Sequence, residues 1–190
     1  GFVASTHPNL IKVINYMVER TSLPTKINMY PILPYAQGYV LKMTEKGMEG
    51  VENPSELFLR QGGSGKGEVG SVKICAMEGT RPMLVEIQAL VTQSALAIPR
   101  RVALGVDYNR VLLLLAILEK RAGLQLHGQD IFINVAGGIE ITEPAIDLGV
   151  IAAVASSFRE IPIDPSTFVQ GEVGLAGEIR TVASVEIRLR

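Results

Sequence analysis

Hydrophobic residues between positions 71 and 182 alternate between strand-like and helix-like spacing. SVKICAMEG (71–79) and RPMLVEIQALVT (81–92) predict two strands that meet at Glu78-Gly79, and QDIFINVAGG (129–138) predicts a third. Residues 109–122 predict a helix that ends at Gly123, with basic residues in its last turn. Because VLLLLAIL (111–118) is a continuous apolar run, we expect this helix to be central and buried on nearly all sides.

A second helix is predicted from TEPAIDLGVIAAVASSF (142–158), with Thr142 as its cap and Pro144 in its first turn. Asp147 lies near the front of this helix, where the chain turns apolar. We interpret it as a carboxylate that stabilises the first turn through the helix dipole and free N–H groups, a contribution of ~0.3–1 kcal/mol. After this helix, PSTFVQGEVGLAGEIRTV (165–182) predicts a strand, a turn punctuated by glycine and another strand.

The first 70 residues have a different pattern. Residues 1–38 predict an amphipathic helix and then an extended segment, and YVLKMTEKGMEGV (39–51) predicts a hairpin. A short helix is expected after the N-cap Asn53. QGGSGKGEVGS (61–71) is expected to be a flexible loop. It is not a phosphate loop, because the Walker A template requires glycine where Arg60 stands and serine or threonine where Gly67 stands.

Composition narrows the chemistry. The chain has 190 residues, with 18 basic and 19 acidic side chains, one cysteine and two histidines. We therefore expect no metal site and no disulfide framework, and we interpret Cys75 as a buried core thiol in a reducing, cytoplasmic setting. The longest apolar run is far shorter than the ~18–20 residues of a membrane helix, so we expect no membrane association. A formal net charge of −1 argues against a grossly basic nucleic-acid binder but not against a local basic face.

Long ordered blocks of the chain resemble the C-terminal domain of the RadA (Sms) family of bacterial DNA-repair proteins. They are MTEKGMEGVENPSELFL, MEGTRPMLVEIQALV, IPRRVALGVDYNRVLLLLAILEKRAGL, DIFINVAGGIEITEPAIDLGVIAAVASSFREIPI and GEVGLAGEIRTV. The resemblance covers residues 39–190, and residues 1–38 match nothing in that family. It implies an α+β or α/β fold, namely a Lon protease-like domain with the mixed sheet of ribosomal protein S5 domain 2 packed on helices.

In Lon proteases the helix that follows a proline- and glycine-rich turn carries a nucleophilic serine just before Ala-Gly-Val. The matching stretch here begins at Asp147, and the place of the dyad lysine falls on Glu186. The resemblance therefore implies that the catalytic pair is degenerate, because two carboxylates cannot generate a serine alkoxide. The four-cysteine zinc motif and the ATPase core of the family are also missing from this sequence, which we interpret as a fragment, so we expect neither zinc, ATP nor magnesium to bind it.

The resemblance implies a partner as well. The family acts on branched or single-stranded DNA, and its Lon-like domains would form one tier of a hexameric ring. We therefore expect sequence-independent contacts with DNA phosphates from the basic residues Arg100, Arg101, Arg110, Lys120 and Arg121.

Two alternatives stay open. The chain could be an active Lon-type endopeptidase with a displaced Ser–Lys dyad, or an oligomerisation module with no role on DNA. Ser156 and Ser157 lie at the far end of the second helix with no histidine nearby, so we expect them to pack rather than react. Glu140 and Glu143, which precede that helix, are expected to be solvated rather than to form a paired-carboxylate hydrolase site.

Overall fold

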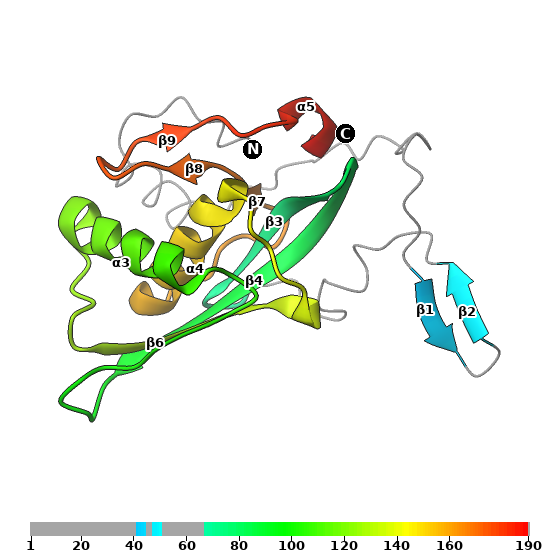
Figure 1. Cartoon of the computed structure of the whole chain (residues 1–190). Coiled ribbons are helices and arrows are strands. Elements are labelled where there is room, and N and C mark those ends of the chain that lie inside the picture. The colour runs from blue at the N-terminus through cyan, green and yellow to red at the C-terminus, as the bar shows by residue number, and fades with distance from the viewer. Residues whose placement is uncertain (1–40, 45–46, 51–66, 190) are drawn as a thin grey trace.

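The computed structural model describes residues 41–44, 47–50 and 67–189. Its centre is a five-stranded mixed sheet with the strand order β5-β6-β4-β3-β7. Two helices, α3 (Tyr108–Ala122) and α4 (Asp147–Arg159), lie on one face of this sheet (Figure 1). The predicted mixed α/β character is confirmed.

The central hairpin was correctly predicted. β3 (Ser71–Glu78) pairs antiparallel with β4 (Arg81–Gln93), and β4 pairs antiparallel with β6 (Gln129–Val135). The two sheet edges are short parallel strands, β5 (Arg101–Leu104) beside β6 and β7 (Phe168–Val169) beside β3. Sequence reasoning did not predict β5, whose four residues are too few to show a periodic pattern.

Smaller elements complete the described part of the chain. β1 (Leu41–Thr44) and β2 (Gly47–Gly50) form the antiparallel hairpin predicted for residues 39–51. β8 (Glu172–Val173) and β9 (Ile179–Arg180) form another, and α5 (Val185–Arg188) follows it. The 3-10 turns Ala136–Gly138 and Pro144–Ile146 lead from β6 into α4. The helices predicted within residues 1–38 and after Asn53 lie outside the described residues.

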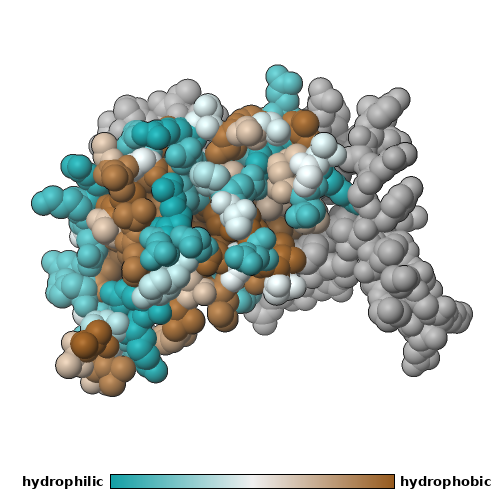
Figure 2. All heavy atoms as spheres, viewed as in Figure 1, coloured by the Kyte–Doolittle hydropathy of each residue, from teal (hydrophilic) through white to brown (hydrophobic). Residues whose placement is uncertain are grey.

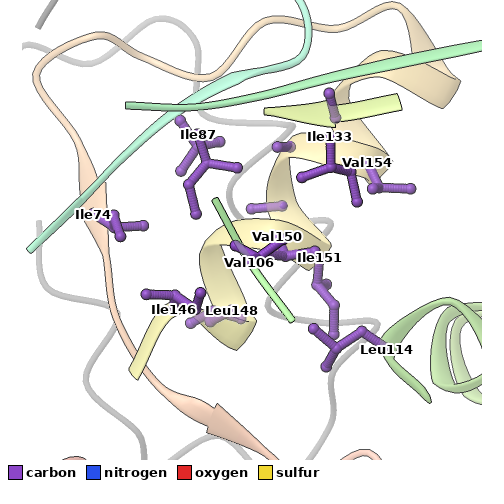
Figure 3. Close-up of a cluster of buried hydrophobic side chains, with 14 of the residues drawn as sticks. Ile74, Ile87, Val106, Leu114, Ile133, Ile146, Leu148, Val150, Ile151 and Val154 are labelled. Carbon is purple, nitrogen blue, oxygen red and sulfur yellow. The ribbon is translucent and has the colours of Figure 1, made fainter. Parts of the chain in front are cut away.

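α4 forms the centre of the core. Every residue from Asp147 to Ser157 is buried, and the helix packs on β3 and β4. Figure 3 shows Leu148, Ile151 and Val154 of α4 in one buried cluster with isoleucines of the sheet and Leu114 of α3. A Cβ atom on Gly149 would lie 2.3 Å from Cγ2 of Ile74, so only glycine permits this close approach of helix and strand.

The prediction that residues 109–122 are buried on nearly all sides is wrong. The core contains only one face of α3, whose buried members are Val111, Leu114, Leu115, Ile117 and Leu118. Leu113 is 44% exposed and Leu112 is exposed as well. Only one face of the helix contacts the core, although leucine occupies positions on both faces. Its predicted end at Gly123 is confirmed, with φ of 72° in the left-handed region.

The glycine-rich segment is packed at the end that the structure describes. Gly70 is buried with φ of 78°, its N–H donates to Ser156 Oγ at 2.9 Å and its carbonyl accepts from Ala89 N at 2.8 Å. The flexible loop expected over 61–71 therefore does not extend through its last residues. Residues 61–66 lie outside the described part.

Candidate functional site

Asp147 begins α4, directly after the 3-10 turn that contains Pro144. The predicted cap at Thr142 is wrong, because the helix starts five residues later and its capping residue, Ile146, offers no side-chain hydrogen bond. Pro144 instead opens the 3-10 turn. The Asp147 side chain is only 1% exposed, so its charge must be balanced within the protein.

Arg110 supplies that balance from the first turn of α3. Its Nε donates to Asp147 Oδ1 at 3.0 Å and its Nη2 donates to Oδ2, which makes the pair bidentate. The pKa of Arg110 is raised, mainly because its guanidinium hydrogen-bonds to this carboxylate. The side chain of Arg110 is one third exposed, so solvent reaches the arginine side of the ion pair.

The ion pair also holds β8. Asp147 Oδ2 accepts from Val173 N at 3.0 Å, and Arg110 Nη2 donates to Val173 O at 3.1 Å. Three elements far apart in the sequence, α3, α4 and β8, therefore meet at one ion pair. Asp147 lies in the first turn of its helix, as the sequence interpretation requires, but that interpretation missed its partners on α3 and β8.

A second ion pair fixes the C-terminal helix. Arg188, whose side chain is 2% exposed, donates to both oxygens of Glu143 and to the carbonyl of Cys75. Glu143 also accepts from Met77 N at 2.8 Å. Glu143 is therefore a structural partner of α5 and β3 rather than a solvated side chain. Sequence reasoning missed Arg188, because nothing in its local pattern distinguishes it from a surface arginine.

Glu186, which the resemblance to Lon proteases predicts at the second place of a degenerate dyad, is exposed on α5. Its carboxylate is not among the partners of Arg110 or Asp147 in the described structure. The two residues predicted at the dyad places are thus a buried carboxylate paired with Arg110 and an exposed carboxylate. Neither is a nucleophile with an adjacent base.

The serines of α4 satisfy backbone groups. Ser156 Oγ donates to Ile161 O at 2.6 Å and accepts from Gly70 N, while Ser157 Oγ accepts from Val91 N at 2.9 Å. Both residues are buried. These hydrogen bonds connect α4 to the sheet and to the loop that follows the helix, which agrees with a packing role. None of the partners in these bonds is a lysine or a histidine.

The five basic residues predicted to contact DNA differ in their environments. Nε and Nη2 of Arg100 both donate to Asp130 Oδ2, at 3.1 and 2.7 Å, and the backbone N–H of Arg100 donates to Oδ1. The guanidinium lies 5.5 Å from the centre of the Phe132 ring, and the side chain is still 59% exposed. The guanidinium of Arg101 donates to the carbonyls of Arg100, Gln129 and Leu126.

Arg110 is held by Asp147, whereas Lys120 and Arg121 are exposed in the last turn of α3. The structure therefore brings no single cluster of five cations together through these contacts. The accessible positive charges of this set are Lys120 and Arg121, at the end of α3, and the exposed part of Arg100.

Two further classes of site, a metal centre and a membrane span, have no candidate among the described residues. No group of three or more histidine, cysteine, aspartate or glutamate side chains there could hold a metal ion. In the same residues, none of the helices has the length and apolarity that crossing a membrane requires. Cys75 is buried, and burial raises its pKa to about 11.

Known proteins provide the remaining observation. The chain is 50% identical over 151 residues to the DNA repair protein RadA of Bacillus subtilis, which is 80% of this chain and 32% of that protein. It is 49% identical over 150 residues to RadA of Escherichia coli, at 79% and 32% coverage. This chain is a homologue of the DNA repair protein RadA. It spans about a third of the length of these curated relatives. No protein-family model matches it.

Proposed function

We propose that residues 39–190 form a Lon-like domain, of the ribosomal protein S5 domain 2 type, that serves a RadA-type recombination and repair ATPase as a non-proteolytic scaffold. The domain supports a hexameric ring and contacts branched or single-stranded DNA without sequence preference. Identity of about half to RadA proteins over four fifths of the chain supports this family context. A mixed sheet covered on one face by helices agrees with the Lon-like fold.

The observation that carries the proposal is the ion pair at Asp147. A Ser–Lys dyad requires a hydroxyl nucleophile and a desolvated lysine that accepts its proton. Here the nucleophile's place holds a carboxylate whose two oxygens are occupied by Arg110 and Val173 N–H. A guanidinium does not act as a base, since arginine stays protonated in proteins. The residues at this place join three elements and are suited to stability rather than hydrolysis.

Contact with DNA is assigned to accessible cations. Lys120 and Arg121 extend from the end of α3, and Arg100 exposes more than half of its side chain. Each cation that neutralises a phosphate releases counterions, which gives affinity without sequence preference and a strong dependence on salt. Arg101 and Arg110 would contribute less, because their donors already serve carbonyls or Asp147.

The test of the scaffold role combines peptide release with assembly mass. The full chain is incubated with an unfolded protein such as casein, and its mass in solution is measured by sedimentation. We expect no released peptides and a multi-subunit mass. Release that is abolished by Ser156→Ala or Ser157→Ala would overturn the non-proteolytic role in favour of a displaced dyad.

Asp147→Ser with Glu186→Lys serves as a matched variant. It restores the two residue types of the dyad without the surrounding support, and we expect it to be inactive as well, because catalytic groups need their positions fixed to a fraction of an ångström. A single-subunit mass for the parent chain would overturn the assembly role. An assembled chain that binds no DNA would instead favour the pure oligomerisation module.

A further inference from the structure

The loop between β4 and β5 has an exposed apolar end. Ile98 is 83% exposed and Leu96 is 52% exposed, and the alanines beside them, Ala95 and Ala97, are exposed as well. The loop projects from one end of the sheet, at the lower left of Figure 1, and Figure 2 shows hydrophobic side chains at the same corner. We call residues 94–99 the apolar tip. Exposed apolar side chains gathered in one place usually mark a contact surface.

Both ends of the apolar tip are anchored. At its first residue, the N–H of Ser94 donates to Gly128 O at 3.0 Å. Just after its last residue, the backbone N–H and the guanidinium of Arg100 donate to Asp130. The guanidinium of Arg101 donates to carbonyls in β6 and in the segment before it. The tip is therefore presented from a fixed base, and little ordering is needed when it meets a ligand.

The charges around the tip indicate what kind of ligand fits it. None of residues 93–101 is acidic, and the nearby carboxylate of Asp130 is 2% exposed and paired with Arg100. The side chain of Arg100 is 59% exposed at the base of the tip. An aliphatic projection with a cation beside it complements a ligand that has both an apolar face and a negative charge. A nucleotide has both, in its base and its phosphate.

The size of the tip also favours DNA over a protein. A specific protein interface takes about 20–30 residues on each side, whereas the tip has six. Leucine, isoleucine and proline are among the side chains that DNA-bending proteins insert as wedges between base steps, while cations hold the neighbouring phosphates. The tip contains all three of these residue types.

We infer that the apolar tip inserts Leu96 and Ile98 between bases where the stack of a DNA is interrupted, as at a branch point, while Arg100 contacts an adjacent phosphate. The inference rests on the DNA contact in the proposed function and names the form of DNA that this part of the site selects. Separating bases costs least where they are already poorly stacked, and burial of two aliphatic side chains offsets that cost. The chain should therefore prefer forked DNA to a continuous duplex, and the tip should cause that preference.

The test uses the full chain and a forked DNA with 2-aminopurine at the branch point, whose fluorescence rises when the base is unstacked. We expect the parent to raise this fluorescence and Leu96→Ser/Ile98→Ser to leave it unchanged. The variant should bind the fork at least about tenfold more weakly, because aliphatic burial is lost. Its dependence on salt should equal that of the parent, since the tip has no charge. A continuous duplex of the same length should bind the two proteins alike.

Two control variants accompany this test. Leu175→Ser removes another exposed leucine, 67% exposed in the turn between β8 and β9, and should behave as the parent. Leu96→Met/Ile98→Met keeps the tip apolar and should retain both the fluorescence rise and the preference for the fork, because methionine also serves as a wedge.

The results separate failure of the inference from failure of the proposed function. A parent that binds no DNA at low salt would overturn the DNA contact itself. If the parent binds the fork without a rise in fluorescence and the serine variant binds it equally well, the wedge is wrong while DNA contact stands. A serine variant that loses self-association but keeps its affinity for the fork would assign the tip to a protein contact and overturn the inference. A serine variant that melts well below the parent would do the same, because the tip would then be covered within its own chain.

Discussion

At the residue scale, Asp147 connects its own helix to two other elements. The carboxylate is buried, bidentate to Arg110 and bonded to Val173 N–H, so it connects α3, α4 and β8. Burying two charges gains little by itself, but removing one partner leaves the other uncompensated. Replacing one partner of this ion pair should therefore destabilise the fold more than replacing both partners.

Arg110→Met should destabilise the fold by about 3 kcal/mol, because it leaves Asp147 buried without a counter-charge. Arg110→Met/Asp147→Leu should recover a substantial part of that loss, since the buried charge is removed. Urea denaturation gives both values. Arg180→Met is the matched control: its ion pairs with Glu172 and Glu178 are exposed, so it should cost less than about 1 kcal/mol. An Arg110→Met variant as stable as the parent would contradict the role assigned to this pair.

Asp130 gives a pH prediction. The backbone N–H of Arg100, and then its guanidinium, lower the pKa of Asp130 to about 2 from an ordinary 3.8. A lowered folded-state pKa contributes stability that is present above about pH 4 and is lost as the pH falls through about 2. The melting temperature of Asp130→Asn should therefore lie below that of the parent at pH 7, and the gap should narrow at pH 2.5. A gap that is the same at both pH values would show that the charge of Asp130 does not contribute.

At the scale of elements, the described part of the chain was predictable where its pattern was periodic. The hairpin β3–β4, strand β6, helix α3 and its end at Gly123 all followed from apolar spacing and glycine chemistry. β5 and α5 were not predicted, because four residues contain no period; the equally short β1 and β2 were predicted only because a turn signal joins them as a hairpin. The pairing of β5 and the packing of α5 are decided by residues far away in the sequence.

Residues of the candidate site were singled out individually from the sequence, but the ion pair that joins them was not predicted. Asp147 was singled out from the sequence, and Arg110 was named for a different reason, yet nothing in the local pattern joins residues 37 positions apart. Arg188 was missed for the same cause. Long-range ion pairs depend on how the helices cross the sheet, and side-chain type alone does not encode that.

The orientation of α3 leads to a prediction about two adjacent leucines. Leu114 is 1% exposed and Leu113 is 44% exposed, so their truncation should have unequal effects. Leu114→Ala should cost about 2–5 kcal/mol by creating a cavity, whereas Leu113→Ala in a monomeric sample should cost less than about 1 kcal/mol. Thermal melts at low protein concentration compare the two. Equal losses would mean that the helix is rotated from the orientation described above.

At the scale of the whole molecule, the domain has a firm core and separate surfaces for separate tasks. Helix α4 and the sheet form the interior, and ion pairs at Asp147 and Arg188 hold β8 and α5 to it. In the proposed function, the accessible cations Arg100, Lys120 and Arg121 contact DNA phosphates. If the proposed scaffold role is right, DNA binding should strengthen on assembly, because the weak contacts of each subunit then act on one strand together.

The contacts of the basic residues determine which of them can be substituted in a test of DNA binding. Arg100→Glu would bring a second carboxylate beside buried Asp130, so a loss of DNA binding could not be separated from a loss of stability. Lys120 and Arg121 are exposed at the end of α3 and can be reversed without breaking either ion pair of the core. Arg180→Glu serves as a control for the change of overall charge.

The most direct test of the account is a fluorescence-anisotropy titration of single-stranded DNA at several salt concentrations, with the parent and Lys120→Glu/Arg121→Glu both in the assembled state. Each phosphate contact contributes about 0.7 to the slope of log affinity against log salt, so loss of two contacts should reduce that slope by about 1.4 for each subunit on the strand. We expect the variant to bind more weakly to every sequence, with this flatter slope and an unchanged melting temperature. Equal affinity and equal slope for the two proteins at low salt would contradict the account, because these cations would then not face DNA.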